Sequence, residues 1–255
     1  MVSTVSVGLE RSKVTPLWKG RQSISVRPVE FAGGYGAYGS SAYRGHRKKV
    51  VQREPSGSFT KRLFDVAASG SALLFFLPLF LFIAAMIKTT SPGPVFFTQY
   101  RYGYRNRKFK IYKFRSMRSD QGDKLGVQQT IQGDARVTRI GKIQRKTSFD
   151  ELPRLINVLR GDMSLVGPRP HVPGMLAANM LYEDLVPYYF QRHSARPGIT
   201  GLAQISGCRG STVDPTLAIA RIDYDLDYIE AWSMVKDIRI IVETVRKEFI
   251  SGNAF

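Results

Sequence analysis

The chain has 255 residues, enough for one domain of ordinary size plus extensions. Lysine and arginine number 38 against 20 aspartates and glutamates, which gives a formal net charge of +18. Such an excess favours anionic partners: nucleic acid, an acidic membrane surface or a phosphorylated substrate. The single cysteine, Cys208, excludes a disulfide within the chain and is typical of a reducing compartment.

Residues 1–58 have the composition of a basic, disordered tail. Glycine, serine, tyrosine and basic residues are frequent, and no helical or strand period persists. Such a segment buries too little apolar surface to offset the entropy of ordering it. Arg47, Lys48 and Lys49 either contact anionic lipid headgroups or are simply solvated. The first 50 residues contain no apolar run of the signal-peptide kind, so we expect no cleavable leader.

An uncharged apolar segment covers residues 66–87. As a helix it would extend about 33 Å at roughly 1.5 Å per residue, enough to cross the core of a bilayer. Pro78 lies just past its middle and interrupts the helical hydrogen bonds. Lys61 and Arg62 precede the segment and several basic residues follow it. Because basic residues mark the cytoplasmic side, residues 59–90 form either a kinked span or a re-entrant helix whose two ends share the cytoplasm.

Two aromatic and β-branched runs follow, at residues 95–100 and 108–114. The loop between them contains Gly103, so the runs predict a β-hairpin whose loop is longer than a tight turn. Residues 116–140 are polar and contain glycine, which predicts an irregular loop.

The remainder of the chain is predicted to be mainly helical, so the fold class is α+β with helices dominant. Amphipathic spacing indicates helices over residues 179–190, 219–232 and 234–249. The apolar stripe of the last helix consists of Ile238, Ile241, Val242, Val245 and Phe249. This stripe either faces the core or lies on anionic lipid as an amphipathic interfacial helix.

Asp150 and Glu151 precede a helical pattern that ends at Gly161. Ser148 and Glu151 match the capping box S-x-x-E, which would make these polar side chains structural. Pro153 disfavours that alternative, because only with Asp150 as the cap does the proline lie inside the first turn, where no N–H donor is needed. Asp150 would then lie at the positive end of the helix dipole, which favours both an ionised carboxylate and bound phosphate.

Two arginines are held in turns stiffened by proline. Arg169 stands between Pro168 and Pro170, and Arg196 precedes Pro197. A pre-positioned guanidinium suits bidentate contact with phosphate oxygens, although a single arginine often forms only a surface salt bridge. The three histidines make no zinc pattern, and neither glycine-rich nucleotide motif is present.

Taken together, these motifs resemble the bacterial sugar transferases, monotopic phosphoglycosyl transferases that begin lipid-linked glycan synthesis. The segments that carry the resemblance are Ser91-Pro92-Gly93-Pro94-Val95-Phe96, Tyr112-Lys113-Phe114-Arg115-Ser116-Met117, Thr147-Ser148-Phe149-Asp150-Glu151-Leu152-Pro153, Gly161-Asp162-Met163-Ser164-Leu165-Val166-Gly167-Pro168-Arg169-Pro170 and Arg196-Pro197-Gly198-Ile199-Thr200-Gly201. The similarity begins near Thr60 and is to the short, exopolysaccharide-priming form. It implies that residues 59–90 are re-entrant and that residues 91–255 form a catalytic domain on the cytoplasmic face of the bacterial inner membrane.

The resemblance also implies a site and a reaction. Asp150 falls on the family's nucleophile and Mg²⁺ ligand, and Glu151 on its neighbouring acid. The residues that would bind substrate are Arg145, Arg169, Arg196 and Lys113. A hexose-1-phosphate, galactose or glucose, would pass from a UDP-sugar to undecaprenyl phosphate through a covalent phospho-sugar aspartate. Membrane lipid is the implied surroundings, and association into a homo-oligomer is compatible with the sequence.

Two functions of other classes also fit the charge: a membrane-anchored protein that binds nucleic acid, and a non-catalytic membrane scaffold. The arginines are grouped around a carboxylate pair, which would repel a phosphate backbone that carries no metal. We therefore expect no nucleic-acid partner. Full transferase activity after Asp150→Asn would favour the scaffold.

Overall fold

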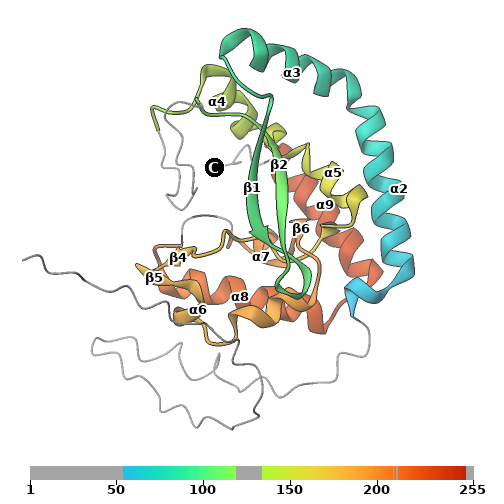
Figure 1. The fold of residues 1–255 in the computed structure, drawn as a ribbon. Coiled ribbons are helices and arrows are strands. Elements are labelled where there is room, and N and C mark those ends of the chain that lie inside the picture. Colours follow the sequence, from blue (N-terminus) through green and yellow to red (C-terminus); the bar gives the residue numbers. More distant parts are fainter. Residues whose placement is uncertain (1–53, 119–133, 209, 211, 251–255) are drawn as a thin grey trace, which may run out of the picture. The chain divides into compact units, whose positions relative to one another are not determined.

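The computed structural model describes residues 54–118, 134–208, 210 and 212–250. The predicted tail up to residue 53 and residues 119–133 of the predicted loop lie outside these ranges. The described part combines helices with three two-stranded sheets, and helices dominate, as predicted (Figure 1).

The apolar segment forms two helices, α2 (Phe59–Phe75) and α3 (Leu77–Thr90), which meet at a bend of 62°. Among the described residues no single helix has the length and hydropathy of a membrane span, but this bent pair has them jointly. The predicted break near Pro78 is confirmed. Pro78 lies in the first turn of α3, where its missing N–H leaves no bond unmade. Leu74, Phe75, Leu81 and Phe82 around the bend are exposed.

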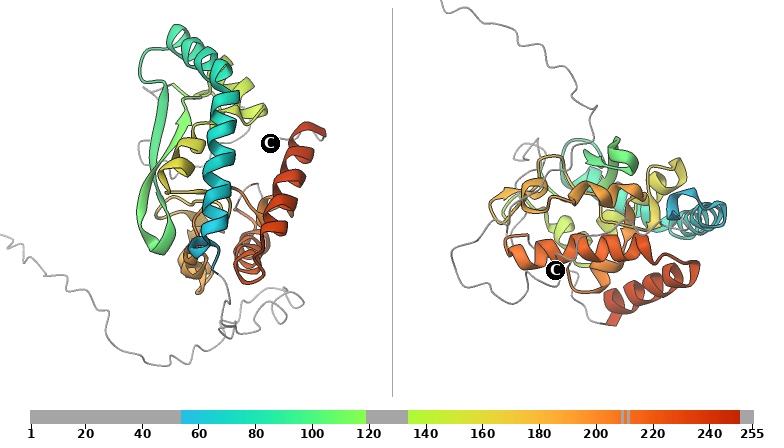
Figure 2. Two further views of the ribbon diagram at one scale, coloured as in Figure 1. Left: turned by 90° about the vertical axis from the view of Figure 1, so that its right-hand side faces the viewer. Right: turned by 90° about the horizontal axis from the view of Figure 1, so that it is seen from below.

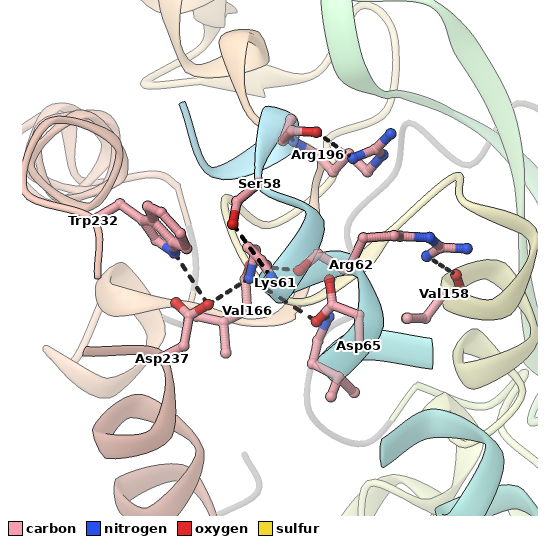
Figure 3. A network of polar contacts seen from close by, with 12 residues as sticks. Ser58, Lys61, Arg62, Asp65, Val158, Val166, Arg196, Trp232 and Asp237 are labelled. Carbon is pink, nitrogen blue, oxygen red and sulfur yellow. Dashed lines mark hydrogen bonds and ion pairs between the residues drawn. The ribbon is translucent and has the colours of Figure 1, made fainter. Parts of the chain in front are cut away.

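The first turns of α2 are fastened to the rest of the domain by polar contacts (Figure 3). Lys61, Asp65 and Ser69 follow one another at every fourth position, and all three are buried. The Lys61 ammonium donates to Asp237 at 2.6 Å, while the Asp65 carboxylate accepts from the backbone N–H of Leu165 at 3.2 Å. Asp237 belongs to α9 (Met234–Ile250), so α2 and the last helix are joined directly.

The predicted hairpin is confirmed as β1 (Phe96–Tyr102) and β2 (Lys108–Phe114), which pair antiparallel from Phe96 with Phe114 to Tyr102 with Lys108. One end of the hairpin packs against α3 through Phe114, Phe96 and the buried Ile83 and Ile87 of that helix. Phe149 and Leu152 join the same cluster, so the bent helix pair packs directly beside residues that flank Asp150 and Glu151.

The main core surrounds α8 (Pro215–Glu230), which Asp214 caps through the N–H of Thr216. Ile222, Leu226 and Ile229 of α8 pack with the buried Ile240 of α9. Beside this core, β3 (Ser164–Val166) and β6 (Gly198–Thr200) pair in parallel. The remaining elements are η1 (Pro55–Gly57), η2 (Tyr104–Asn106), α4 (Arg139–Lys146), η3 (Phe149–Glu151), α5 (Arg154–Arg160), β4 (Leu176–Ala177), β5 (Met180–Leu181), α6 (Tyr182–Leu185), η4 (Tyr189–Ser194) and α7 (Leu202–Ile205).

The helix predicted over residues 179–190 is wrong. That segment contains a short strand, the four-residue α6 and the start of η4. Pro187 is the reason: the residue before a proline avoids the helical region, and Val186 takes an extended conformation with φ −126° and ψ 96°. The helices predicted over 219–232 and 234–249 are confirmed as α8 and α9.

The apolar stripe of α9 faces the core only at Ile241, which packs against the main core, among the stripe residues whose side chains the structure describes. Ile238, Val242 and Val245 are 49%, 57% and 51% exposed, whereas Ile240 on the opposite side is buried. Asp237 and Ile240 also turn toward the domain, which sets these three exposed residues outward. In Figure 2 (left) α2 rises between the hairpin and α9.

Candidate active site

Two elements bring the predicted carboxylates and lysine together. Lys113 projects from the end of β2, and Asp150 and Glu151 lie in η3. The Lys113 ammonium is 3.4 Å from Asp150 Oδ2 and 3.2 Å from Glu151 Oε1. Asp150 is 7% exposed. One ammonium therefore holds both carboxylates on the same side.

Asp150 is not the cap of α5, which corrects the sequence interpretation. Helix α5 begins at Arg154 with Pro153 in the N-cap position, and Ser148 before η3 has a left-handed φ of 55°. The tight turn from Ser148 to Glu151 precedes the helix and aims both carboxylates at Lys113 instead. The predicted end of the helix at Gly161 is confirmed, with a left-handed φ of 88°.

Glu151 is surrounded by cations. Its Oε1 accepts from Arg154 Nη2 at 2.7 Å and from Arg169 Nη2 at 2.9 Å, in addition to Lys113. Burial alone would raise the pKa of Glu151, but the charges of Arg154, Arg169 and Lys113 outweigh burial and hold the pKa well below its usual value. Glu151 is thus held as an anion at neutral pH and contacts three cations.

Arg145 is a second cation that interacts electrostatically with Asp150. It projects from α4, and its Nε donates to Ser116 Oγ at 3.0 Å. Burial lowers the pKa of Arg145, while the charge of Asp150 acts in the opposite direction. Asp150 therefore contacts a cation from β2 and interacts electrostatically with one from α4.

The turn that carries Arg169 is fixed by close backbone packing and by a hydrogen bond from a buried arginine. A side chain on Gly167 would come within 2.3 Å of the Arg196 carbonyl oxygen, so the close approach of the two chain segments requires glycine there. Arg192 donates to the Arg169 carbonyl at 2.6 Å and forms a buried ion pair with Asp225 at 2.6 Å. The rigid turn inferred from the prolines is thus also fixed by a buried pair.

Arg196 lies elsewhere. Its Nη1 donates to the Ser56 carbonyl at 2.8 Å, its Nε donates to the Gly161 carbonyl at 3.1 Å, and its guanidinium lies 5.6 Å from the Tyr104 ring centre. The contacts of Arg196 within the described residues thus connect η1, α5 and η2, and none is with the carboxylate pair. Lys61 and Arg62, expected at the membrane boundary, likewise contact protein: Lys61 is buried and Arg62 donates to the last carbonyls of α5.

Sequence reasoning missed two cations of the cluster, Arg154 and Arg101. Arg154 follows Glu151 by three residues. This spacing brings side chains together on a helix and could have predicted the ion pair between them. Arg101 lies in β1, where the predicted hairpin register could have placed it on the same face as Lys113. Its charge interacts with Arg154, Arg169 and Glu151.

The carboxylate pair fits Mg²⁺. Among the described residues no three acidic, histidine or cysteine side chains are grouped as a complete metal site. Mg²⁺, however, commonly binds one or two carboxylates and completes its shell with substrate phosphates and water. Asp150, whose carboxylate has fewer cation contacts than that of Glu151, is the better placed ligand.

A buried carboxylate pair surrounded by several cations suits the binding of phosphate groups. The chain belongs to the bacterial sugar transferase family, whose model matches residues 56–251. It is 55% identical over 195 residues to an exopolysaccharide production protein of Rhizobium leguminosarum bv. phaseoli, covering 76% of this chain and 98% of that protein.

Two other relatives are longer proteins. The undecaprenyl-phosphate glucose phosphotransferase of Komagataeibacter xylinus is 48% identical over 81% of this chain and 39% of its own length. The UDP-glucose:undecaprenyl-phosphate glucose-1-phosphate transferase of Escherichia coli K12 is 46% identical over 76% of this chain and 41% of its own length. The chain thus spans about two fifths of these relatives.

Proposed function

We propose that this chain transfers a hexose-1-phosphate from a UDP-sugar to undecaprenyl phosphate, the first membrane step of exopolysaccharide synthesis. The observation that carries the proposal is the position of Asp150. It is nearly buried, it lies beside Lys113, and its neighbour Glu151 collects three cations. The names of the relatives support the substrates, and glucose is the first sugar to test.

Asp150 acts as the nucleophile in the first step. One of its carboxylate oxygens attacks the β-phosphorus of the UDP-sugar and forms a P–O bond. The bond between that phosphorus and the bridging oxygen breaks, and UMP leaves with the oxygen and the electron pair. The product on the enzyme is a phospho-sugar ester of Asp150, and no proton transfer is required.

In the second step an oxygen of the lipid phosphate attacks the same phosphorus. The ester bond to Asp150 breaks, which regenerates the carboxylate and yields the lipid diphosphate sugar. Division into two steps lets a water-soluble donor and a lipid acceptor use one site in turn. Arg169 and Lys113 offset the negative charge that would otherwise repel each attack. Mg²⁺, when bound to Asp150 and the substrate phosphates, would neutralise further charge.

The bent pair of α2 and α3 would enter the cytoplasmic leaflet of the inner membrane and return. The exposed apolar side chains at the bend support this, since soluble surfaces rarely expose so many together. The exposed stripe residues Ile238, Val242 and Val245, together with Val235 in the first turn of α9, would lie at the lipid surface. Because α3 packs on Phe149 and Leu152, insertion would bring the carboxylates close to the lipid phosphates.

The test measures the release of UMP from a panel of UDP-sugars. The purified chain is reconstituted in lipid membranes with undecaprenyl phosphate and Mg²⁺. Exchange of labelled UMP into UDP-sugar is measured in parallel without the lipid. We expect UMP release with one sugar and exchange without lipid. We also expect Asp150→Asn to lower both by about a thousandfold or more, while the exposed Asp184→Asn leaves both unchanged.

Silence of the wild-type chain across the whole panel would overturn the proposed function. Turnover that requires lipid, with no exchange in its absence, would replace the covalent intermediate by direct attack in a ternary complex. Wild-type exchange by Asp150→Asn would remove Asp150 from the role of nucleophile.

A further inference from the structure

Arg101 occupies the same face of the hairpin as Lys113. The register pairs Phe97 with Lys113 and Arg101 with Phe109. Side chains of directly paired residues lie on one face, and alternate residues of a strand share it. The face is the inner one, because Ile111, which lies between the two positions, is buried against α5.

The guanidinium of Arg101 interacts electrostatically with the groups that hold Glu151. Burial lowers the pKa of Arg101 to about 9, the charges of Arg154 and Arg169 act in the same direction, and that of Glu151 opposes them. Arg101 Nη2 donates to Gln99 Oε1 at 2.6 Å, a neutral acceptor from its own strand. Its Nε is closed off from solvent and has no hydrogen-bond partner within the described ranges.

Among the residues that the structure describes, the cluster holds more positive than negative charge. Arg101, Lys113, Arg154 and Arg169 are four cations around the carboxylates of Asp150 and Glu151. Elsewhere in the described part of the domain, the buried Arg192 pairs with Asp225, and the buried Arg221 donates to the carbonyls of Cys208 and Gly210. Crowding buried cations in this way is unfavourable unless an anion joins them. The surplus suits the charge of a diphosphate or a phosphate monoester.

We propose that Arg101 is a substrate-binding residue that donates to a phosphate oxyanion in this site. Gln99 holds the Nη2 edge of the guanidinium. The Nε–H, which is covered by protein and has no partner within the described ranges, would be satisfied by an oxyanion that displaces the atoms covering it. The oxyanion belongs either to the diphosphate of the nucleotide-sugar or to the lipid phosphate. The inference rests on the proposed function and adds to it a binding residue from β1.

The test compares Arg101→Gln and Arg101→Lys with Arg107→Gln, an exposed arginine of the same hairpin whose replacement changes the net charge equally. The KM for UDP-sugar is measured in lipid-free UMP exchange, and the KM for both substrates in full turnover. We expect Arg101→Gln to raise one KM roughly tenfold or more, Arg101→Lys to raise it less, and Arg107→Gln to leave it unchanged. A rise in KM for UDP-sugar in both assays assigns the diphosphate, and a rise for the lipid alone assigns the lipid phosphate.

A second measurement is independent of the stability of each variant. For each protein, the melting temperature is measured with and without inorganic pyrophosphate and Mg²⁺. We expect the rise caused by pyrophosphate to be smaller in Arg101→Gln than in wild type, and unchanged in Arg107→Gln. An active wild type whose Arg101 and Arg107 variants match it in every KM and in the pyrophosphate shift would overturn this inference alone. A wild type that releases no UMP would overturn the proposed function instead.

Discussion

Two regions of this domain bury a pair of carboxylates, and they balance them differently. At the base of α2, Asp65 and Asp237 share the single ammonium of Lys61 (Figure 3). Neutral donors supply the rest: the Trp232 indole N–H and the Tyr228 hydroxyl both donate to Asp237, at 3.2 and 2.8 Å. Around Asp150 and Glu151 the partners are charged and outnumber the acids.

The difference distinguishes a structural cluster from a site for a ligand. The Lys61 cluster has donors for its acids without any added molecule, and it joins segments 176 residues apart. In the described part of the chain, the cluster around Glu151 contains more cations than acids, a charge balance that favours an added anion. Burial and distance alone do not separate the two regions, since both contain nearly buried ion pairs. The ratio of cations to acids does.

The largest effect on stability is expected from Lys61→Met. It removes the one cation with which Asp237 forms an ion pair among the described residues and leaves a buried carboxylate uncompensated, which should lower the free energy of unfolding by about 3–5 kcal/mol. Thermal unfolding in detergent or nanodiscs measures it. Lys142→Met, at an exposed position of α4, is the control and should change stability by no more than about 0.5 kcal/mol.

A double variant sharpens the same comparison. If Lys61 and Asp237 act as a pair, Lys61→Met with Asp237→Asn should cost clearly less than the sum of the single changes. Additive losses, or a single variant that melts like wild type, would show that α2 is held by its apolar contacts and not by this network.

Local patterns in the sequence predicted the elements that depend on near neighbours. The apolar run with Pro78 gave the bent pair of helices, and the two aromatic runs gave the hairpin. The sequence could not pair Lys61 with Asp237, because a basic residue beside an apolar helix has the pattern of a membrane flank and its partner lies near the other end of the chain. The capping role of Asp150 failed because Ser148 adopts a left-handed turn that no residue preference required.

The site itself was predicted in part. Lys113, Asp150, Glu151, Arg145 and Arg169 converge. That grouping came from a family resemblance, since single-residue reasoning had left the carboxylates as a helix cap. Arg101 on β1 could not be assigned to the cluster in this way, because its position depends on the strand register, which becomes known only with the fold.

Mild acid should leave the charge pattern of the site intact while it weakens the domain through two histidines. Burial, aided by Arg192, lowers the pKa of His193 to about 3, and burial also lowers that of His171. Both are neutral when folded and take up a proton near pH 6.5 when unfolded. Stability is therefore full above about pH 6.5 and falls below it by about 1.4 kcal/mol per pH unit for each histidine.

Glu151 loses its contribution to stability at a lower pH than the two histidines do. Its folded pKa lies below the ordinary 4.5, so its contribution persists down to that pH and is lost only as the pH falls further. Melting temperatures between pH 7.5 and 5 should thus decline less steeply in His193→Gln, and equally steeply in Glu151→Gln. If Glu151→Gln abolished the decline in melting temperature between pH 7.5 and 5, Glu151 would take up its proton in that range. The neighbouring cations would then not hold its pKa low.

The smallest effect is expected from Arg196→Lys. This variant tests whether Arg196 is a structural residue, like Lys61, or binds substrate phosphate. The resemblance assigns Arg196 to substrate phosphate, whereas its contacts are the carbonyls of Ser56 and Gly161 and the ring of Tyr104. Lysine cannot reproduce the forked guanidinium contacts, so we expect a loss of about 1 kcal/mol in unfolding free energy and an unchanged KM for UDP-sugar. Arg169→Lys, the matched change at a residue that contacts Glu151, should raise that KM. An Arg196→Lys variant with wild-type melting and a raised KM would move Arg196 back into the phosphate site and require a substrate-bound arrangement in which it leaves its carbonyl partners.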